Sequence, residues 1–419
     1  MIAGRRAGIR RFLAFAVWLL AAPAYGQFFE EFLGPPPAVQ SLITDDQVEP
    51  AALFQPPALS TPTESSAAAT RPTTRSRRQL ASVPNMFGDI GMTTAQALFI
   101  NVAGNVAARG TFDIPGAGGS SPVKIGENDS PIPVDRVFFN YNHFHNVFEF
   151  QEFPLFGIPQ PILRQLPIDR YTVGFEKTFL GGDWSVEMRL PFNGTVDAQG
   201  NFFSVGSGNW GNLAVIVKNL VYADDVLAIG AGLGIDTPTG SSAQAIIGNT
   251  QLRFENDAVH LLPYVGGIWS PTESLFFTSF LQVDVATGGN EVLVSAPGLT
   301  AQSAGLFNNQ NLLYVDAGVG CWLYQNPYAE WITGIASVLE FHYTTALQDT
   351  DAIFFQQGTT FALISNPRNR FDVVNLTAGV NFLLGEMSNL RVAGVFPLGD
   401  SPDQRFFDAE VQVQFNQRF

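Results

Sequence analysis

The chain has 419 residues, of which 46% are hydrophobic and only 14% are charged, and its formal net charge is −15. Soluble domains usually carry about 25% charged residues, so the low charged fraction favours a protein that meets lipid over much of its surface. The negative charge argues against nucleic acid as a partner. With the single cysteine Cys321, no intramolecular disulfide can form.

The first 26 residues have the pattern of an export signal. Four arginines precede the short apolar run 12–22, and the small-x-small sequence Ala24-Tyr25-Gly26 follows it. A basic segment, a short apolar run and a small-residue cleavage site are typical of a secretory signal peptide. An uncleaved membrane anchor is the alternative, although the run is well short of the about 20 residues that a spanning helix needs. We therefore predict a cleavable signal peptide at residues 1–26.

Two segments separate this signal from the first strong strand pattern. Residues 27–83 are rich in Pro, Ser, Thr and Ala, a composition that cannot bury enough apolar surface to offset the entropy of ordering. We predict a disordered linker there, with a tether to cell wall or anionic lipid as the alternative. Residues 84–136 are rich in Gly and turns, and the sequence leaves open whether they form a plug inside a barrel or an ordinary extension before it.

From residue 137 onward, apolar and polar residues alternate in segments separated by turns. Alternation with a period of two is typical of a strand with one apolar and one polar face. Twelve such segments occur, at residues 137–147, 171–179, 184–192, 213–222, 226–235, 259–269, 275–286, 312–324, 331–344, 373–384, 390–398 and 407–419. Each is long enough to cross a bilayer at a tilt.

The connections between these segments alternate in length, with short turns such as 180–183 between pairs and longer loops such as 236–258 between the pairs. Short periplasmic turns and long extracellular loops are typical of outer-membrane barrels. We therefore predict an all-β fold, an antiparallel transmembrane β-barrel of about 12 strands (range 10–14) at residues 137–419, in the bacterial outer membrane.

The two faces of the predicted strands differ in charge. In three of these strands, 184–192, 312–324 and 373–384, one row carries no charge, as in Trp184, Val186, Met188 and Leu190. The opposite rows hold charged residues that we predict to line the lumen: Glu187, Arg189, Lys218, Asp284, Asp316, Glu340, His342, Arg391, Asp408, Glu410 and Arg418. In a small barrel such residues mostly pair with one another and fill the interior, whereas an excess of carboxylates in an open pore favours cations.

Two further features bear on function. The last strand ends on Phe419 after outward apolar residues at alternate positions, which resembles the C-terminal assembly signal of outer-membrane barrels; the resemblance implies a signal at Val411, Val413, Phe415 and Phe419 and the barrel assembly machinery as a partner. The loop 148–167 is unusually apolar, and we expect Phe150, Phe153, Phe156 and Ile158 to form a constriction at the barrel mouth or to pack on neighbouring loops.

Motifs for chemistry are few. The pair His143 and His145 has a spacing compatible with two metal ligands, but no third ligand is identifiable. Two histidines at this spacing on a strand are more often polar residues of a lumen or rim. The chain has no Gly-x-Ser-x-Gly motif. We predict neither a cofactor nor an enzymatic activity.

The sequence 230–240, Gly-Ala-Gly-Leu-Gly-Ile-Asp-Thr-Pro-Thr-Gly, resembles the strand-then-loop signature of a family of outer-membrane proteins associated with phenol and aromatic-compound degradation. The resemblance implies that Asp236, Pro238 and Gly240 mark a strand exit into a loop, and that the barrel passes small hydrophobic or aromatic solutes. The run Gly230, Gly232 and Gly234 also has its own explanation, because small residues allow close approach or bending of the wall.

The sequence thus predicts a passive outer-membrane channel or uptake protein whose partners are outer-membrane lipid and a small-molecule solute. Two other hypotheses remain. One is a non-conducting surface or scaffold protein, in which the long loops bind. The other is a soluble secreted β-sandwich, in which the charge-free rows of two sheets pack against each other.

Overall fold

The structure is a computed structural model that describes most of the chain after residue 79. The described residues are 80–89, 94–103, 106–115, 122–153, 162–194, 197–199, 203–207, 210–247, 250–295, 300–349, 351–357, 360–365, 370–399 and 404–419. They all belong to one structural unit, Ala69–Phe419. The predicted signal peptide and most of the predicted linker lie outside the described residues.

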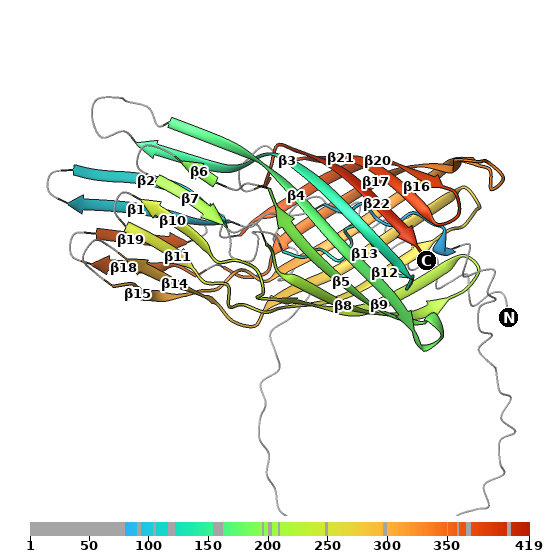
Figure 1. Cartoon of the computed structure of the whole chain (residues 1–419), viewed down its shortest axis with the longest axis horizontal. Helices are drawn as coiled ribbons and strands as arrows, with labels where there is room; N and C mark the ends of the chain where they lie inside the picture. The colour runs from blue at the N-terminus through green and yellow to red at the C-terminus, as the bar shows by residue number, and fades with distance from the viewer. Residues whose placement is uncertain are drawn as a thin grey trace, which may run out of the picture. The chain divides into compact units, whose positions relative to one another are not determined.

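Twelve antiparallel strands form a closed barrel (Figure 1). In order around the ring they are β3 (Arg136–Phe153), β4 (Ile162–Phe179), β5 (Trp184–Asn193), β8 (Leu213–Ala223), β9 (Leu227–Thr237), β12 (His260–Trp269), β13 (Leu275–Ala286), β16 (Leu312–Gln325), β17 (Ile332–Ala346), β20 (Asp372–Leu384), β21 (Ser388–Pro397) and β22 (Ala409–Arg418). The ring closes because β3 pairs with both β22 and β4. The predicted antiparallel barrel of about twelve strands is confirmed, and the two-sheet sandwich hypothesis is wrong.

The two ends of the barrel differ in the length of their connections. At one end, called the short-turn end below, the strands are joined by tight turns, including the 3-10 turn η1 (Leu180–Gly182). The last strand also finishes there, because the backbone N–H of Arg418 donates to the carbonyl of Met387 in one of these turns, at 2.8 Å. The opposite end, the long-loop end, carries the long connections.

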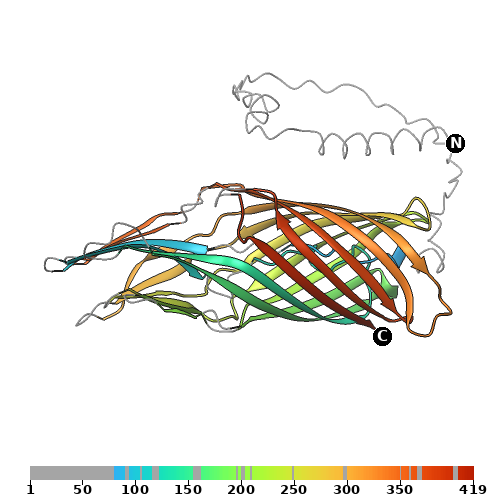
Figure 2. The ribbon, with the colours of Figure 1, turned by 90° about the horizontal axis from the view of Figure 1, so that it is seen from above.

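The long connections contain strands that the sequence did not predict. β6 (Asp197–Gln199), β7 (Phe203–Ser207), β10 (Ala243–Ile247), β11 (Thr250–Phe254), β14 (Asn290–Ser295) and β15 (Gln302–Phe307) form a second, six-stranded sheet. β1 (Thr94–Ala103), β2 (Val106–Pro115), β18 (Ile353–Gln357) and β19 (Thr360–Ser365) extend the barrel sheet beyond β3. Figure 2 shows these two layers side by side at the long-loop end.

The predicted loop 148–167 is largely strand, which corrects the expected boundaries. β3 continues to Phe153 and β4 begins at Ile162, and this upper part of β3 pairs with β2. The backbone of Phe150 is therefore paired on both sides, with Phe112 of β2 and Arg164 of β4, whereas Phe153 is paired with Arg109 of β2. Phe156 and Ile158 lie outside the described residues, so the predicted constriction stays a prediction.

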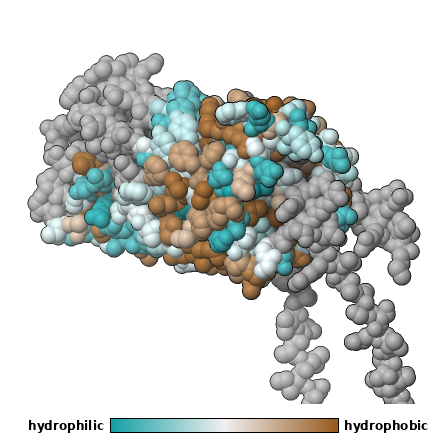
Figure 3. Space-filling model, turned by 45° about the vertical axis from the view of Figure 1, so that its right-hand side comes forward, coloured by the Kyte–Doolittle hydropathy of each residue, from teal (hydrophilic) through white to brown (hydrophobic). Residues whose placement is uncertain are grey.

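Alternate residues of each strand face outward and inward, as the sequence pattern predicted. Along β5, Val186 and Met188 face outward, whereas Glu187 and Arg189 are buried inside the ring. Outward apolar side chains remain exposed, for example Val173 at 51% and Leu281 at 45%. Figure 3 shows such apolar side chains gathered on the barrel wall.

Inward-facing aromatic rings cover glycines on the neighbouring strand. Gly174 lies directly opposite Phe138, and Gly320 directly opposite Phe276. A Cβ added to either glycine would lie 2.0 Å from the ring. The aromatic side chain thus occupies the space that the glycine leaves, which stabilises the register of the two strands. Trp322, near the end of β16, also faces inward and packs against Phe276.

Among the residues that the structure describes, no helix has the length and apolarity to cross a membrane.

Candidate functional site

The interior of the barrel contains two segments of the chain that precede the first barrel strand. Residues 80–89 and residues 122–135, together called the insert below, run through the ring of strands (Figures 1 and 2). Residue 81 lies at the short-turn end, where Arg418 donates to its carbonyl, and Asp135 lies at the same end, where its carbonyl accepts from the N–H of Phe419. The two segments therefore run in opposite directions through the lumen.

The two segments of the insert are bonded to each other. The N–H of Met86 donates to the carbonyl of Asp129 at 2.9 Å, and the N–H of Asn128 donates to that of Phe87 at 3.2 Å. Gly88 adopts φ +76, and a Cβ there would lie 2.6 Å from the Cα of Glu127. Glycine is required at this crossing both for its left-handed backbone and for the close approach.

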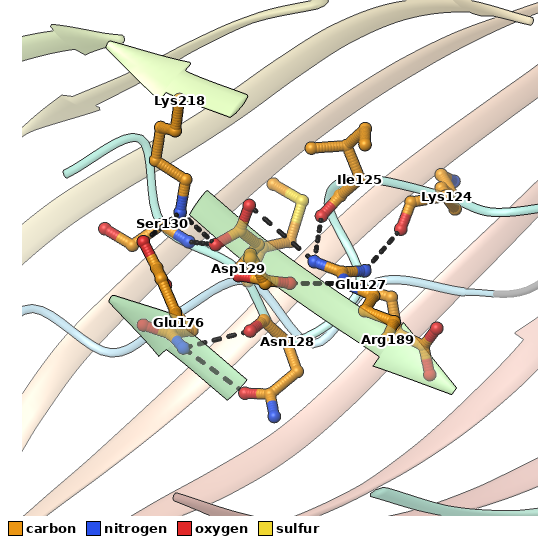
Figure 4. Close-up of polar contacts among 12 residues, drawn as sticks. Lys124, Ile125, Glu127, Asn128, Asp129, Ser130, Glu176, Arg189 and Lys218 are labelled. Atoms are coloured by element: carbon orange, nitrogen blue, oxygen red, sulfur yellow. Dashed lines mark hydrogen bonds and ion pairs between the residues drawn. The ribbon is translucent and has the colours of Figure 1, made fainter. Parts of the chain in front are cut away.

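The first charged group of the site surrounds Asp129 of the insert (Figure 4). Lys218 of β8 lies 2.6 Å from the Asp129 carboxylate and 3.1 Å from Glu176 of β4. Arg136, at the start of β3, lies 3.0 Å from Asp129, 2.8 Å from Glu176 and 2.7 Å from Glu187. All of these side chains are almost fully buried. Because they alternate in sign, each charge has a partner in place of water.

The second charged group surrounds Lys124 of the insert. Its ammonium lies against Asp89, also of the insert, and 2.7 Å from Asp316 of β16. His342 of β17 also belongs to this second group, because its Nδ1 lies 2.8 Å from Asp316. Asp89 also accepts from Asn375 of β20 at 2.6 Å. This group ties the insert to the wall on the side opposite β5 and β8 in the strand order.

Wall side chains also hold the backbone of the insert. Glu340 accepts from the N–H groups of Phe87 and Gly88 at 2.7 and 2.9 Å. Arg189 donates to the carbonyls of Lys124 and Ile125 at 3.0 and 3.2 Å (Figure 4). Hydrogen bonds or ion pairs reach the insert from ten of the twelve barrel strands: β3, β4, β5, β8, β13, β16, β17, β20, β21 and β22.

On β9, glycines bring the insert against the wall. A Cβ on Gly230 would lie 2.2 Å from the carbonyl oxygen of Pro131, and one on Gly234 would lie 3.0 Å from the Ile125 side chain. At Gly232 the close neighbours are instead wall atoms, including the ring of Tyr264. The glycine run therefore serves close approach, and two of its three members face the insert.

Apolar clusters lie at both ends of this polar interior. Near the short-turn end, Leu80, Val83 and Phe87 of the insert pack with wall residues such as Phe276 and Trp322. At the long-loop end, a larger cluster joins inward barrel residues to the additional strands: Phe144, Val147, Ile168, Ala243, Ala245, Leu252, Phe254, Val292, Val294, Phe307, Leu312, Tyr314, Ala346, Ile353, Phe355, Ile364, Phe371, Val373, Val395, Phe406 and Phe407. The insert and these clusters lie inside the ring and at its two ends.

The structure brings eight of the eleven predicted lumen residues together around the insert or beside it. They are buried inside the barrel: Glu187, Arg189, Lys218, Asp316, Glu340, His342, Arg391 and Glu410. Asp284 is also buried but pairs with His260 at 2.6 Å, closer to the long-loop end. Asp408 precedes β22 and pairs with Arg405 at 3.3 Å as a partly exposed residue, and Arg418 is only partly buried at the short-turn end.

Sequence reasoning missed the partners that complete the network. Glu176 lies within a predicted strand, on the same inward row as Thr172, and alternation could have found it. Arg136 lies one residue before the predicted start of the first strand. Asp89, Lys124 and Asp129 belong to the insert, where no periodic signal marks an inward direction.

The residues of the predicted assembly signal and the predicted histidine pair lie on the outer face. Val411, Phe415 and Phe419 are exposed and Val413 is half-buried, which is compatible with an assembly signal without testing it. His143 and His145 also face outward near the long-loop end, and His143 bonds to Asp169 at 2.8 Å.

Two buried groups have the spacing of metal ligands: Asp89 with Asp316 and His342, and Asp129 with Glu176 and Glu187. In both, cations of the chain already lie between the carboxylates. Lys124 occupies the first group, and Arg136 and Lys218 occupy the second. The donor sets therefore fit internal ion pairs better than a metal ion.

No protein-family model and no curated protein matches the chain. Solved structures with a similar arrangement include an outer membrane channel from Pseudomonas putida F1 (TM-score 0.46, 10% identity, covering 71% of this chain and 100% of that one) and the translocator domain of the autotransporter NalP from Neisseria meningitidis (0.41, 10%, 70% and 90%). The toluene transporter TbuX of Ralstonia pickettii is a third (0.32, 9%, 68% and 90%).

Proposed function

We propose that this protein is an outer-membrane β-barrel channel that its own insert holds closed. The observation that carries the proposal is the insert itself, two chain segments bonded to ten wall strands inside the ring. The exposed apolar outer wall and the contrast of short turns with long loops support a place in the outer membrane. Solute passage then requires the insert to move.

We further propose that the solute is small and hydrophobic or aromatic. The cluster at the long-loop end supports this, because a solute that enters there meets aromatic and aliphatic side chains such as Phe254, Phe307 and Phe371. Apolar side chains with few polar groups are typical of sites for apolar ligands. The test is uptake of a radiolabelled aromatic hydrocarbon by cells that carry the protein, compared with cells that do not.

A non-conducting surface protein is the second candidate function. The buried ion pairs favour it, because separating Lys124 from Asp89 and Asp316 would leave unpaired charges inside the barrel. In that case the additional strands at the long-loop end are the functional part, and the barrel anchors them.

Conductance distinguishes the channel from the non-conducting surface protein. The chain without its predicted signal peptide is folded in detergent, checked by gel migration with and without boiling, and reconstituted in a planar bilayer. We expect wild type to stay closed with rare openings, and a deletion of residues 80–135 to give steady open steps. A folded deletion variant that does not conduct would contradict the channel.

A milder variant covers the case in which the deletion does not fold. Glu340→Gln removes the charge that accepts from Phe87 and Gly88, so we expect more frequent openings. The control is Arg253→Gln, which alters an exposed ion pair at the long-loop end and should leave the openings unchanged.

A further inference from the structure

An apolar groove lies on the outer face of the barrel, across β22, β3, β4 and β5 and reaching the first residue of β8. Its volume is 460 Å³, and apolar side chains line it, among them Val137, Phe139, Val173, Phe175, Met188 and Phe415. This volume is within the range of about 300–1,000 Å³ that is typical of ligand sites.

The groove arises from side-chain size at paired positions. Phe415, Phe139 and Val173 are neighbours across one row of the sheet, and Val137 and Phe175 are neighbours across the next row towards the short-turn end. The two valines are shorter than the phenylalanines beside them, so a hollow remains between the rings. Both valines are well exposed, at 42% for Val137 and 51% for Val173.

Charges of both signs lie just beyond the groove towards the short-turn end. Lys177 is the next outward residue after Phe175 on β4, and its ammonium lies 2.7 Å from Asp135. The ring of Phe419 stacks on Phe175, with centroids 5.9 Å apart, and lies 5.0 Å from the Lys177 ammonium. The Lys177 side chain is 52% exposed, so it can also meet an external anion.

Asp135 is held in place as an acceptor. The N–H and the hydroxyl of Thr178 both donate to one of its oxygens at 2.7 Å, and Lys177 pairs with the other. Burial would raise the pKa of Asp135, but the bonds from Lys177 and Thr178 outweigh it and hold this pKa below its ordinary value. The carboxylate therefore stays charged at neutral pH.

We propose that the groove binds an acyl chain of a phospholipid whose headgroup carries both a phosphate and a primary ammonium. The phosphate would pair with Lys177 and the ammonium with Asp135. Charge complementarity selects this headgroup, because a purely anionic one would face the Asp135 carboxylate and a quaternary ammonium could not donate a hydrogen bond to it. The inference rests on the proposed place in the outer membrane.

Lipid retention tests the site. The full chain, purified in detergent, is incorporated in vesicles with equal amounts of ethanolamine, glycerol and choline phospholipids of the same acyl chains, then extracted, and the retained lipid is measured by mass spectrometry. We expect wild type to retain the ethanolamine lipid in several-fold excess. Lys177→Gln and Asp135→Asn should each remove most of this preference, and Val173→Trp should lower total retention by filling the groove.

The matched control is Leu339→Trp, an outward position on β17 that is exposed to a similar degree and lies outside the groove. Gel migration with and without boiling shows that each variant is folded, and Val173→Phe replaces Val173→Trp if the latter is not. Equal retention by the two tryptophan variants, or equal retention of the three headgroups by wild type, would overturn the proposal.

A wild-type dimer that Val173→Trp dissociates, with no lipid retained, would assign the groove to a second copy of the chain and also overturn it. A chain that stays folded and soluble without detergent would instead overturn the proposed membrane location. A barrel that inserts in vesicles but retains no lipid leaves the proposed channel standing and removes only the groove site.

Discussion

The inner and outer faces of the barrel are built from alternate residues of the same strands, yet they differ in charge and in what covers them. On β5, Glu187 and Arg189 face inward and are almost fully buried, whereas Val186 and Met188 face outward. The inner charges are neutralised by partners that come largely from elsewhere in the sequence, including Asp129 of the insert. The outer row needs no such partner if lipid surrounds it.

The comparison implies that the two faces depend on different conditions. The inner face is stable only while oppositely charged groups stay together, because each is shielded from water. The outer face is stable only while charge stays away from it. Substitutions that remove a charge from the inner face or place one on the outer face should therefore destabilise the barrel most.

The largest expected effect is the loss of a buried cation from the inner face. Lys218→Met removes the ammonium that pairs with Glu176 and one of the cations that pair with Asp129. Breaking a buried ion pair on one side costs about 3–5 kcal/mol. We expect a loss of this size in the free energy of unfolding, measured by urea titration in lipid vesicles with gel migration as the readout.

The double variant Lys218→Met with Glu176→Gln is the control, because it removes a carboxylate together with the cation. It should recover part of the loss. A single variant as stable as wild type would show that water reaches these side chains and that the interior is not sealed.

The second effect comes from placing charge on the outer face. Leu281→Arg puts a guanidinium at an outward position near the middle of β13. Arginine on the lipid face of a barrel costs about 2–4 kcal/mol near the bilayer centre and about 0–1 kcal/mol near its edges. We expect the larger value, measured in the same titration, and a negligible change for Leu281→Met. Equal stability of the two variants would place this part of the wall in water.

The sequence was sufficient to predict the barrel but not to place the insert inside it. Alternation marks strands directly, since every second residue of a strand such as β16 has the same surroundings. The expected and observed bounds of this strand, 312–324 and Leu312–Gln325, differ by one residue. Even the inward direction of Asp316 and Glu340 follows from the same pattern.

The insert could not be placed because its contacts are specific and not periodic. Asp129 is buried by partners on β3, β5 and β8, and no repeat in residues 122–135 records this. Eight of the ten additional strands at the long-loop end have six residues or fewer, which is too short for alternation to stand out.

The third effect tests the fit between glycines and aromatic rings on the inner face. Gly320→Ala would place a Cβ 2.0 Å from the ring of Phe276, so the ring or the strand must move. Overpacking of a close-packed interior costs about 1–3 kcal/mol. We expect destabilisation in this range, and partial recovery in the double variant with Phe276→Leu. Recovery is the decisive measurement, because a cost that arose only from the backbone would persist when the ring is removed.

The smallest effect belongs to a charge pair that lies on neither face of the barrel. Arg253 of β11 pairs with Glu255 at 2.9 Å, and its side chain is 53% exposed at the long-loop end. Exposed pairs contribute about 0–1 kcal/mol because water screens them and two side chains must be ordered. Arg253→Gln should therefore change the free energy of unfolding by less than Lys218→Met does, although both remove one cation from a carboxylate. A cost for Arg253→Gln as large as that for Lys218→Met would mean that burial does not raise the cost of breaking an ion pair in this protein.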